Sequence, residues 1–213
     1  MFVSRRPMTD TPPIHTVILA AGASRRLGFN KLLVRVGGEP LVRKTAKLFM
    51  DACPGRVIVV TGFEGDLIAA ALQGLPVDIV ANPRHAGGMS TSVKAVLPHL
   101  VDADAVLFHL GDKAFVTRET VRRVIEAGLS QTGAIVVPRW GTEGGHPVLI
   151  RVGPYLAEMA AIDGDRGLRD IIERHHDDVL FVEGDEGVIL DVDTMEDIEG
   201  LKRRGLQVEK AQG

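Results

Sequence analysis

The chain has 213 residues, of which 45% are hydrophobic and 25% are charged, and its formal net charge is −3. This composition is typical of a globular domain, and the slight acidic excess excludes the basic surface that binding to nucleic acid or an anionic membrane requires. The single cysteine, Cys53, excludes an intrachain disulfide and fits a reducing compartment. No apolar run approaches the length of a membrane span or signal peptide, so we expect a cytoplasmic protein.

Residues 1–13 are predicted to be a disordered tail, because they are largely polar and end in Pro12-Pro13. Over residues 14–207, short apolar runs alternate with amphipathic stretches without a dividing linker, which predicts one domain. Strands are expected in the runs TVILA, RVIVVTG, VDIVAN, DAVLFHLGD and GAIVVP, and helices over residues 40–50, 65–72, 90–99 and 118–127. This order predicts βαβ units in an α/β fold whose largely parallel sheet is covered on both faces.

The pattern changes after Pro138. The runs HPVLI, DVLFVEG and GVILDV are expected to be strands, and helices are expected over residues 154–161, 167–175 and 195–203. These elements predict a smaller mixed C-terminal portion that closes over the sheet. Two residues mark helix starts in the first half: Pro40 suits the first turn of its helix, and Thr117 is a candidate N-cap.

Three loops with unusual chemistry follow the carboxyl ends of predicted strands, where open α/β sheets bind ligands. They span residues 20–31, 82–92 and 111–114. The first belongs to the stretch LAAGASRRLGFNK, which matches neither the P-loop nor the dinucleotide-binding fingerprint. Its small residues at 20–22 would let a nucleotide approach the backbone, and its cations, Arg25, Arg26 and Lys31, would attract a polyphosphate. The alternative is a solvated basic loop.

The same stretch resembles the signature L-A-[AG]-G-x-S-x-R-M-G-x-x-K of the MobA-like nucleotidyltransferases, with Leu27 in the place of methionine. Other segments of that family are matched in order by NPRHAGGMSTSVKAVL, LGDKAFV, GGHPVLI, GDRGLRDII and DVDTMEDI. The matches extend from about residue 15 to residue 203. The second alanine of LAAG, with GMSTS and GHPV, is similar to the subgroup of molybdenum cofactor cytidylyltransferases; guanylyltransferase relatives usually read L-A-G-G.

The resemblance implies a three-layer, Rossmann-like fold of the nucleotide-diphospho-sugar transferase type. It also implies a reaction in which an acceptor phosphate oxygen attacks the α-phosphorus of a nucleoside triphosphate and pyrophosphate leaves. For the cytidylyltransferase subgroup the nucleotide is CTP and the acceptor is a molybdopterin-type molybdenum cofactor, with a molybdenum hydroxylase as the client enzyme. Mg²⁺ is the expected ion, because it binds phosphate oxygens and few carboxylates.

The resemblance also assigns roles to individual residues. Lys31 and Arg26 would hold phosphates, and Asp112 and Asp193 would hold the metal, so that Lys31, Arg26 and Asp112 form the expected catalytic set. The nucleotide would be bound by residues of the first two loops: Leu19, Ala20, Ala21, Gly22, Asn82, Ser90 and Ser92.

Each of these residue types has a simpler explanation. Asp112 could cap the turn after its strand, Asp193 could N-cap the following helix, and Ser90 could cap a helix start. Asp191 alternates with Asp193, so we expect the two to share a face of an extended segment, with Asp191 behind the metal ligand or merely solvated. His146 stands near the expected acceptor side, and no group of histidines has the spacing of a zinc site.

One departure from the family pattern concerns the metal loop, which reads GDKA where G-D-x-P is expected. Ala114 lacks the restriction that proline would impose, and we expect Lys113 to face away from the metal if the extended geometry persists. Two alternative functions stay open from the sequence. One is nucleotidyl transfer to a sugar or alditol phosphate, and the other is a non-catalytic protein that binds the cofactor for a molybdenum hydroxylase.

Overall fold

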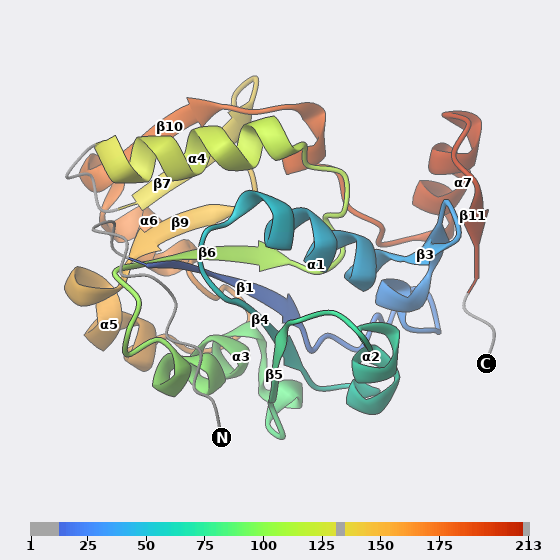
Figure 1. Cartoon of the computed structure of the whole chain (residues 1–213), viewed down its shortest axis with the longest axis horizontal. Coiled ribbons are helices and arrows are strands. Elements are labelled where there is room, and N and C mark those ends of the chain that lie inside the picture. Colours follow the sequence, from blue (N-terminus) through green and yellow to red (C-terminus); the bar gives the residue numbers. More distant parts are fainter. Residues whose placement is uncertain (1–12, 131–134, 211–213) are drawn as a thin grey trace.

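The computed structural model describes residues 13–130 and 135–210 (Figure 1). The predicted tail therefore lies outside the described residues, apart from Pro13. A central sheet has the strand order β10-β7-β9-β6-β1-β4-β5, with β8 paired to β7. Its strands are β1 (Ile14–Ala20), β4 (Val57–Thr61), β5 (Asp78–Ala81), β6 (Ala105–Leu110), β7 (Ile135–Trp140), β8 (Glu143–Gly144), β9 (Val148–Arg151) and β10 (Val179–Glu183).

The central sheet is mostly parallel, as the sequence predicted. Strands β6, β1, β4 and β5 pair in parallel, and so do β10 and β7, whereas β9 is antiparallel to both β6 and β7. The strands of the C-terminal half therefore extend the same sheet. The small antiparallel sheet is a separate unit of order β11-β2-β3, formed by β2 (Arg35–Val36), β3 (Glu39–Pro40) and β11 (Val208–Glu209).

Helices cover both faces of the central sheet, which gives the predicted three layers (Figure 1). Side chains alternate along the buried strands: Val57 and Val59 pack on one face, and Ile58 and Val60 on the other. The first face is covered by α1 (Leu41–Ala52), α2 (Gly65–Ala71) and α4 (Arg118–Ser130), and the second by α3 (Met89–Val96), α5 (Val152–Ala161) and α6 (Arg169–Arg174).

A third apolar cluster joins the segment after β1 to the C-terminal segment around α7 (Met195–Arg203). Leu27 and Val34, after β1, pack with Ala114 and with Ile198 of α7. Ala114 belongs to the loop of residues 111–114, which keeps the name metal loop from its sequence motif. This cluster holds the C-terminal segment beside the loop that follows β1.

The helix starts expected from sequence are close to those observed. The Thr117 hydroxyl accepts a hydrogen bond from the Thr120 amide at 3.3 Å, as an N-cap does. Helix α1 begins one residue later than expected, at Leu41, with Pro40 in the N-cap position. Helix α3 ends at Val96 and passes into a 3₁₀ helix over Leu97–His99, because Pro98 has no amide hydrogen to continue α-helical bonding.

The strand predicted for GVILDV is wrong. Residues Glu186–Val188 form a 3₁₀ turn, and the chain then continues without regular structure to α7. The Asp185 carboxylate accepts the Gly187 amide at 2.8 Å, which closes this turn. The apolar side chains of the run are buried nonetheless, Val188 in one core cluster and Val192 in another, because the segment packs across other loops instead of pairing in a sheet.

Candidate active site

The three loops singled out in the sequence start side by side at the carboxyl ends of adjacent parallel strands. Ala20 at the end of β1 is in register with Thr61 of β4, and Thr61 is in register with Ala81 of β5. On the other side of β1, Leu19 is in register with Leu110 of β6. Because the strands run in the same direction, the loops that leave them open onto one region above the sheet edge.

A cavity of about 450 Å³ lies in this region. The residues that line it come from all three loops and from a fourth, between α5 and α6. They are Leu19, Ala21, Gly22, Ala23, Arg25, Lys31, Leu32, His85, Ala86, Gly88, Met89, Ser92, Leu110, Asp112 and Asp165. Its size is within the range of small-molecule sites.

The cavity brings together most of the expected nucleotide-binding residues: Leu19, Ala21, Gly22 and Ser92 line it, and so do Lys31 and Asp112. Ala20, Asn82 and Ser90 do not line it. Ala20 is 1% exposed and belongs to the core beneath β1.

Asn82 and Ser90 are buried beneath the second loop, residues 82–92, and hold its conformation. The Asn82 amide donates to the hydroxyls of Thr91 at 2.8 Å and Ser92 at 3.0 Å, and its oxygen accepts the Arg84 amide at 3.0 Å. Ser90 is fully buried inside α3, whose N-cap position is occupied by Gly88, so Ser90 is not the cap. The Asn82 side chain thereby orients Ser92, which reaches the cavity.

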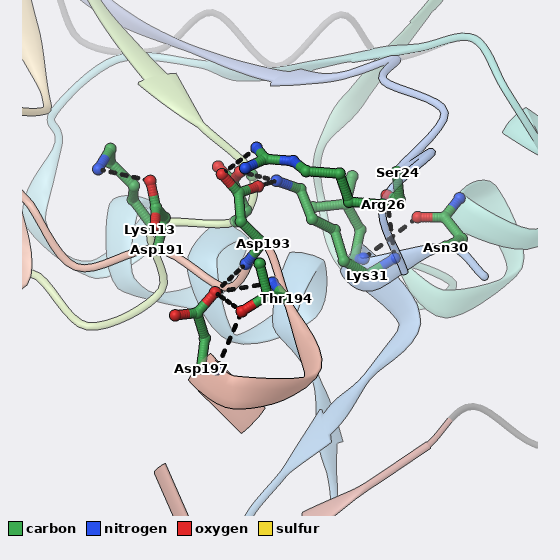
Figure 2. Close-up of polar contacts among 12 residues, drawn as sticks. Ser24, Arg26, Asn30, Lys31, Lys113, Asp191, Asp193, Thr194 and Asp197 are labelled. Carbon is green, nitrogen blue, oxygen red and sulfur yellow. Dashed lines mark hydrogen bonds and ion pairs between the residues drawn. The ribbon is translucent and has the colours of Figure 1, made fainter. Parts of the chain in front are cut away.

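Lys31 lines the cavity and is held there by local structure. The Asn30 side chain accepts the Leu32 amide at 3.1 Å and caps a 3₁₀ helix over Lys31–Leu33, and the Lys31 amide donates to the Ser24 hydroxyl at 3.1 Å. The Lys31 ammonium contacts the carboxylates of both Asp112 and Asp193. Arg26, whose side chain is 68% exposed, also contacts Asp193 (Figure 2).

These contacts determine the charges of the group. Burial alone would lower the pKa of Lys31, but attraction from Asp112 and Asp193 outweighs it and raises that pKa above its ordinary value. Burial opposes the charge of Asp193 as well, yet Lys31 and Arg26 lower its pKa. The Lys31 ammonium and the Asp193 carboxylate are therefore both charged at neutral pH.

Asp193 reaches this place on a segment that crosses the metal loop, residues 185–194, which we call the strap. Its first residue, Asp185, accepts hydrogen bonds from the hydroxyls of Thr117 at 2.6 Å and Thr120 at 2.5 Å. Its last residue, Thr194, forms a capping box with Asp197 at the start of α7. The helix cap is thus Thr194 and not Asp193, which leaves the Asp193 carboxylate available to Lys31.

The metal loop places its two charged side chains in different directions. Asp112 contacts Lys31 at the cavity, whereas the Lys113 ammonium donates to the Ile189 carbonyl of the strap at 2.9 Å. The Lys113 ammonium thus points to the strap, but the loop is a turn closed by the Lys113 amide on the Leu110 carbonyl at 3.1 Å, and not the extended segment on which the expectation from sequence depended. Asp191 lies 3.5 Å from the Lys113 ammonium and contacts neither Lys31 nor Arg26.

The pair Asp112 and Asp193 suits a hard cation, because two carboxylates direct oxygen atoms at the single point where the Lys31 ammonium lies. Within residues 13–130 and 135–210, no group of three or more His, Cys, Asp or Glu side chains could hold a metal ion. A metal held by this pair would take its other ligands from phosphate oxygens and water, as Mg²⁺ commonly does.

Sequence reasoning missed several residues of the cavity. Arg25, which the sequence offered as a cation for a polyphosphate but not as part of the expected catalytic set, lines the cavity, whereas Arg26 does not. His85, Met89 and Asp165 line it as well; the first two belong to the motif NPRHAGGMSTSVKAVL and the third to GDRGLRDII, but none was singled out as a site residue. The Gly164 carbonyl, beside Asp165, accepts the Ser90 amide at 3.0 Å, which brings the loop of Asp165 onto the start of α3. His146 does not line the cavity. Its Nδ1 lies 3.3 Å from the Phe108 carbonyl oxygen, and burial lowers its pKa to about 4.

Comparison with known proteins identifies the family. The description "MobA-like NTP transferase domain" matches residues 16–179, which is most of the chain. The chain belongs to this family. Membership confirms the resemblance seen in the sequence and makes the protein a nucleotidyltransferase-type enzyme by family.

Relatives of this MobA-like chain carry more than one activity in their names. It is 29% identical over 196 residues to the molybdenum cofactor cytidylyltransferase of Escherichia coli K12, covering 92% of this chain and 98% of that protein. It is 28% identical over 197 residues to nicotine blue oxidoreductase of Paenarthrobacter nicotinovorans, with 88% and 96% covered.

Solved structures agree on the fold. Rv0371c of Mycobacterium tuberculosis H37Rv has a TM-score of 0.79 at 29% identity, covering 92% of this chain and 100% of that one. A manganese complex of Rv0371c has a TM-score of 0.75 at 26% identity, with 90% and 98% covered.

In this MobA-like chain, no helix of the described residues is long and apolar enough to cross a membrane.

Proposed function

We propose that the chain transfers a cytidylyl group from CTP to a molybdopterin-type molybdenum cofactor and releases pyrophosphate. The observation that carries the proposal is the group formed by Lys31, Asp112 and Asp193, of which the first two line the cavity. An ammonium and a carboxylate pair beside a cleft of nucleotide size are what a triphosphate with its metal requires. The relative named molybdenum cofactor cytidylyltransferase supports this choice of nucleotide and acceptor.

The reaction is a substitution at phosphorus: an oxygen of the acceptor phosphate forms a bond to the α-phosphorus, and the bond to the pyrophosphate oxygen breaks. The protein's contribution is to align the two oxygens and to balance charge, since little covalent work falls to side chains. Lys31 and Arg25 supply positive charge to the triphosphate from the cavity wall, and Arg26 supplies it from the rim. Asp112 and Asp193 would hold Mg²⁺, which supplies further positive charge when bound.

Nucleotide choice depends on the loop after β1. The Ala21 side chain lines the cavity and packs so near the Gly62 position that a Cβ atom there would lie 2.8 Å from the Cβ of Ala21. Its methyl group narrows the place that glycine would leave open for a larger base. We expect CTP to be used about tenfold better than GTP in kcat/KM, and Ala21→Gly to reduce this preference. Equal or better use of GTP by the unaltered chain would contradict the assignment.

One assay tests the proposal against its rivals. Pyrophosphate release is measured with CTP and purified molybdenum cofactor, and in parallel with a sugar phosphate or an alditol phosphate as acceptor. Release only with the cofactor supports the proposal, and release only with another acceptor would assign that reaction instead. Cofactor binding without release would favour an accessory protein that serves a molybdenum hydroxylase. A redox reaction without pyrophosphate release would align the chain with its oxidoreductase relative.

The proposed reaction also implies a domain, a compartment and a client enzyme. Residues 14–207 would act as one catalytic domain in the cytoplasm, and a molybdenum hydroxylase would receive the product. Limited proteolysis tests the first point, because a single domain should yield one resistant core that keeps pyrophosphate release.

A further inference from the structure

The fourth loop of the cavity carries a carboxylate that the proposed reaction does not use. This loop, residues 162–168, joins α5 to α6, and Asp165 near its middle lines the cavity. Asp165 is exposed, and its neighbour Arg166 contacts Asp170 and Glu173 of α6. In the described part of the chain, no hydrogen bond or ion pair occupies the Asp165 carboxylate. The carboxylate is therefore available to accept hydrogen bonds from a ligand.

Close packing of the fourth loop on the second loop fixes the position of Asp165. The Gly164 carbonyl accepts the Ser90 amide at 3.0 Å. A Cβ atom at Gly88 would lie 2.7 Å from the Gly164 carbonyl oxygen and 2.8 Å from Oδ1 of Asp165. Only glycine at residue 88 lets the two loops approach each other so closely. Backbone contacts between the loops thus place the carboxylate beside the second loop, at the cavity.

The charges around the cavity limit what Asp165 can face. In the proposed reaction the triphosphate lies against Lys31 and Arg25 of the first loop, which line the cavity. A carboxylate repels phosphate oxygens, so Asp165 must face an uncharged part of a ligand that donates hydrogen bonds. The nucleoside is assigned to residues of the first two loops, such as Ala21 and Ser92. This assignment leaves the fourth loop for the acceptor.

The pterin of a molybdopterin-type cofactor presents suitable donors. Its aminopyrimidinone ring carries a ring N–H and an exocyclic amino group side by side, and the two oxygens of one carboxylate accept both at once. Cytosine instead carries its amino group beside a ring nitrogen with a lone pair, which a carboxylate repels. Cytosine therefore offers a carboxylate one hydrogen bond only, and the acceptor matches Asp165 better than the base does.

We propose that Asp165 determines acceptor specificity by accepting the paired hydrogen bonds of the pterin ring. The inference rests on the proposed function in one respect, the identity of the acceptor as a molybdopterin-type cofactor. Asp165 binds the acceptor and takes no part in the substitution at phosphorus. Replacing it should therefore weaken acceptor binding and leave CTP binding unchanged.

The test measures the binding of pterin itself, 2-amino-4-oxopteridine, to the full chain by equilibrium dialysis with CTP and Mg²⁺ present. Asp165→Asn keeps the size of the side chain but turns an amide donor toward one of the pterin donors. We expect this variant to bind pterin about tenfold more weakly, because hydrogen bonds to charged groups are the strong ones. The matched control, Asp163→Asn, removes the same charge from an exposed residue of the same loop that does not line the cavity. It should bind pterin like the unaltered chain.

A matched ligand tests the same contact without a variant. Lumazine has an oxygen in the place of the amino group of pterin, so the Asp165 carboxylate would face an acceptor there. We expect the unaltered chain to bind lumazine about tenfold more weakly than pterin, and Asp165→Asn to lose this preference. If Asp165→Asn does not fold by circular dichroism, the comparison of the two ligands on the unaltered chain decides alone.

Three results would overturn the proposal. The first is equal binding of pterin and lumazine, or no binding of pterin, by the unaltered chain. The second is unchanged pterin binding by Asp165→Asn. The third is a loss of CTP affinity in Asp165→Asn as large as its loss of pterin affinity, because the carboxylate would then face the nucleotide.

The outcome can be separated from that of the proposed function. If pterin binding depends on Asp165 but no pyrophosphate is released with any acceptor, acceptor recognition stands and the transfer reaction fails. If pyrophosphate is released with CTP and molybdenum cofactor while Asp165→Asn leaves the KM for the cofactor unchanged, the proposed function stands and the role of Asp165 fails.

Discussion

The two ends of β1 each carry a network of ion pairs, but only the one at the carboxyl end belongs to the proposed site. At the amino end, Arg56 donates to Asp102 at 2.8 Å and to Asp78 at 3.2 Å, and His15 lies 3.2 Å from Asp102. At the carboxyl end, Lys31 joins Asp112 and Asp193. The chemistry of the groups is similar at the two ends.

The difference lies in burial and in what the carboxylates face. The side chains of Asp78 and Asp102 are 54% and 57% exposed, so water competes for their contacts with Arg56. Those of Asp112 and Asp193 are 13% and 23% exposed, and Asp112 lines the cavity of about 450 Å³, whereas Arg56 and Asp78 line a second cavity of about 230 Å³. A cluster of ion pairs is therefore no sign of a site by itself, because at the amino end it joins the starts of neighbouring strands. Partial burial of the carboxylates, and not merely a neighbouring cavity, distinguishes the carboxyl end.

The largest expected effect contrasts one carboxylate from each end. Asp112→Asn should lower nucleotidyl transfer by about 10²–10³-fold, because a neutral amide no longer balances the charge of a metal ion or of Lys31. Asp102→Asn, at the amino end, should leave transfer unchanged. Initial rates of pyrophosphate release are measured against Mg²⁺ concentration. Full activity of Asp112→Asn, or no response of the unaltered chain to divalent ions, would mean that the chain has the fold without the chemistry.

The next prediction contrasts two cations. Lys31→Ala should lower kcat by about 10²-fold while the protein stays folded, since the triphosphate loses its buried partner. Arg56→Ala should lower the stability of the fold and leave kcat nearly unchanged. It removes hydrogen bonds to Asp78, Asp102 and the His99 carbonyl, which costs about 1–3 kcal/mol of stability, and activity at low temperature should persist. Denaturant unfolding and steady-state rates are measured on both variants. Equal loss of activity in the two would contradict the expected contrast between Lys31 and Arg56.

Acid should lower the free energy of unfolding through protonation of His109, which lies near the carboxyl end of β6. Burial lowers the pKa of His109 to about 3, whereas an unfolded chain protonates histidine near pH 6.5. Between those pH values the unfolded state binds one more proton, so the free energy of unfolding falls as the pH falls, by about 1.4 kcal/mol per pH unit. His146, whose pKa burial lowers to about 4, acts in the same direction, so His109→Gln should reduce the slope between pH 6 and pH 4 in urea unfolding by about 1.4 kcal/mol per pH unit without removing it. An unchanged slope would mean that other groups carry the acid sensitivity.

The smallest effect is expected for Ala114→Pro, which restores the residue of the family pattern. Among the described residues, the Ala114 amide donates to no backbone acceptor, so proline removes no hydrogen bond there. Ala114 is 5% exposed within the cluster beside α7, where added volume partly offsets the gain from a stiffer unfolded chain. We expect the melting temperature to change by less than about 4 °C, with transfer retained. A collapse of folding would show that the loop requires a conformation that proline forbids.

Much of the molecule could be predicted from sequence alone. The buried strands and their alternating faces follow from runs such as TVILA, and the convergence of the loops after β1, β5 and β6 follows from parallel pairing. Lys31 and Asp112 were identified by their motifs, and the cavity includes both. Local signals of this kind act over a few residues, so one sequence is enough to read them.

The tertiary structure decided where the strap runs and what it brings to the site. An apolar run such as GVILDV fits a strand and a buried irregular segment equally well, and only packing against the metal loop selects the second. Contacts between distant residues, such as Lys113 with Ile189, Lys31 with Asp193 and Asp165 with the cavity, depend on how the chain crosses itself. No local propensity encodes them. They exist because burial of the cluster around Leu27 and Ile198 holds the C-terminal segment beside the loop after β1.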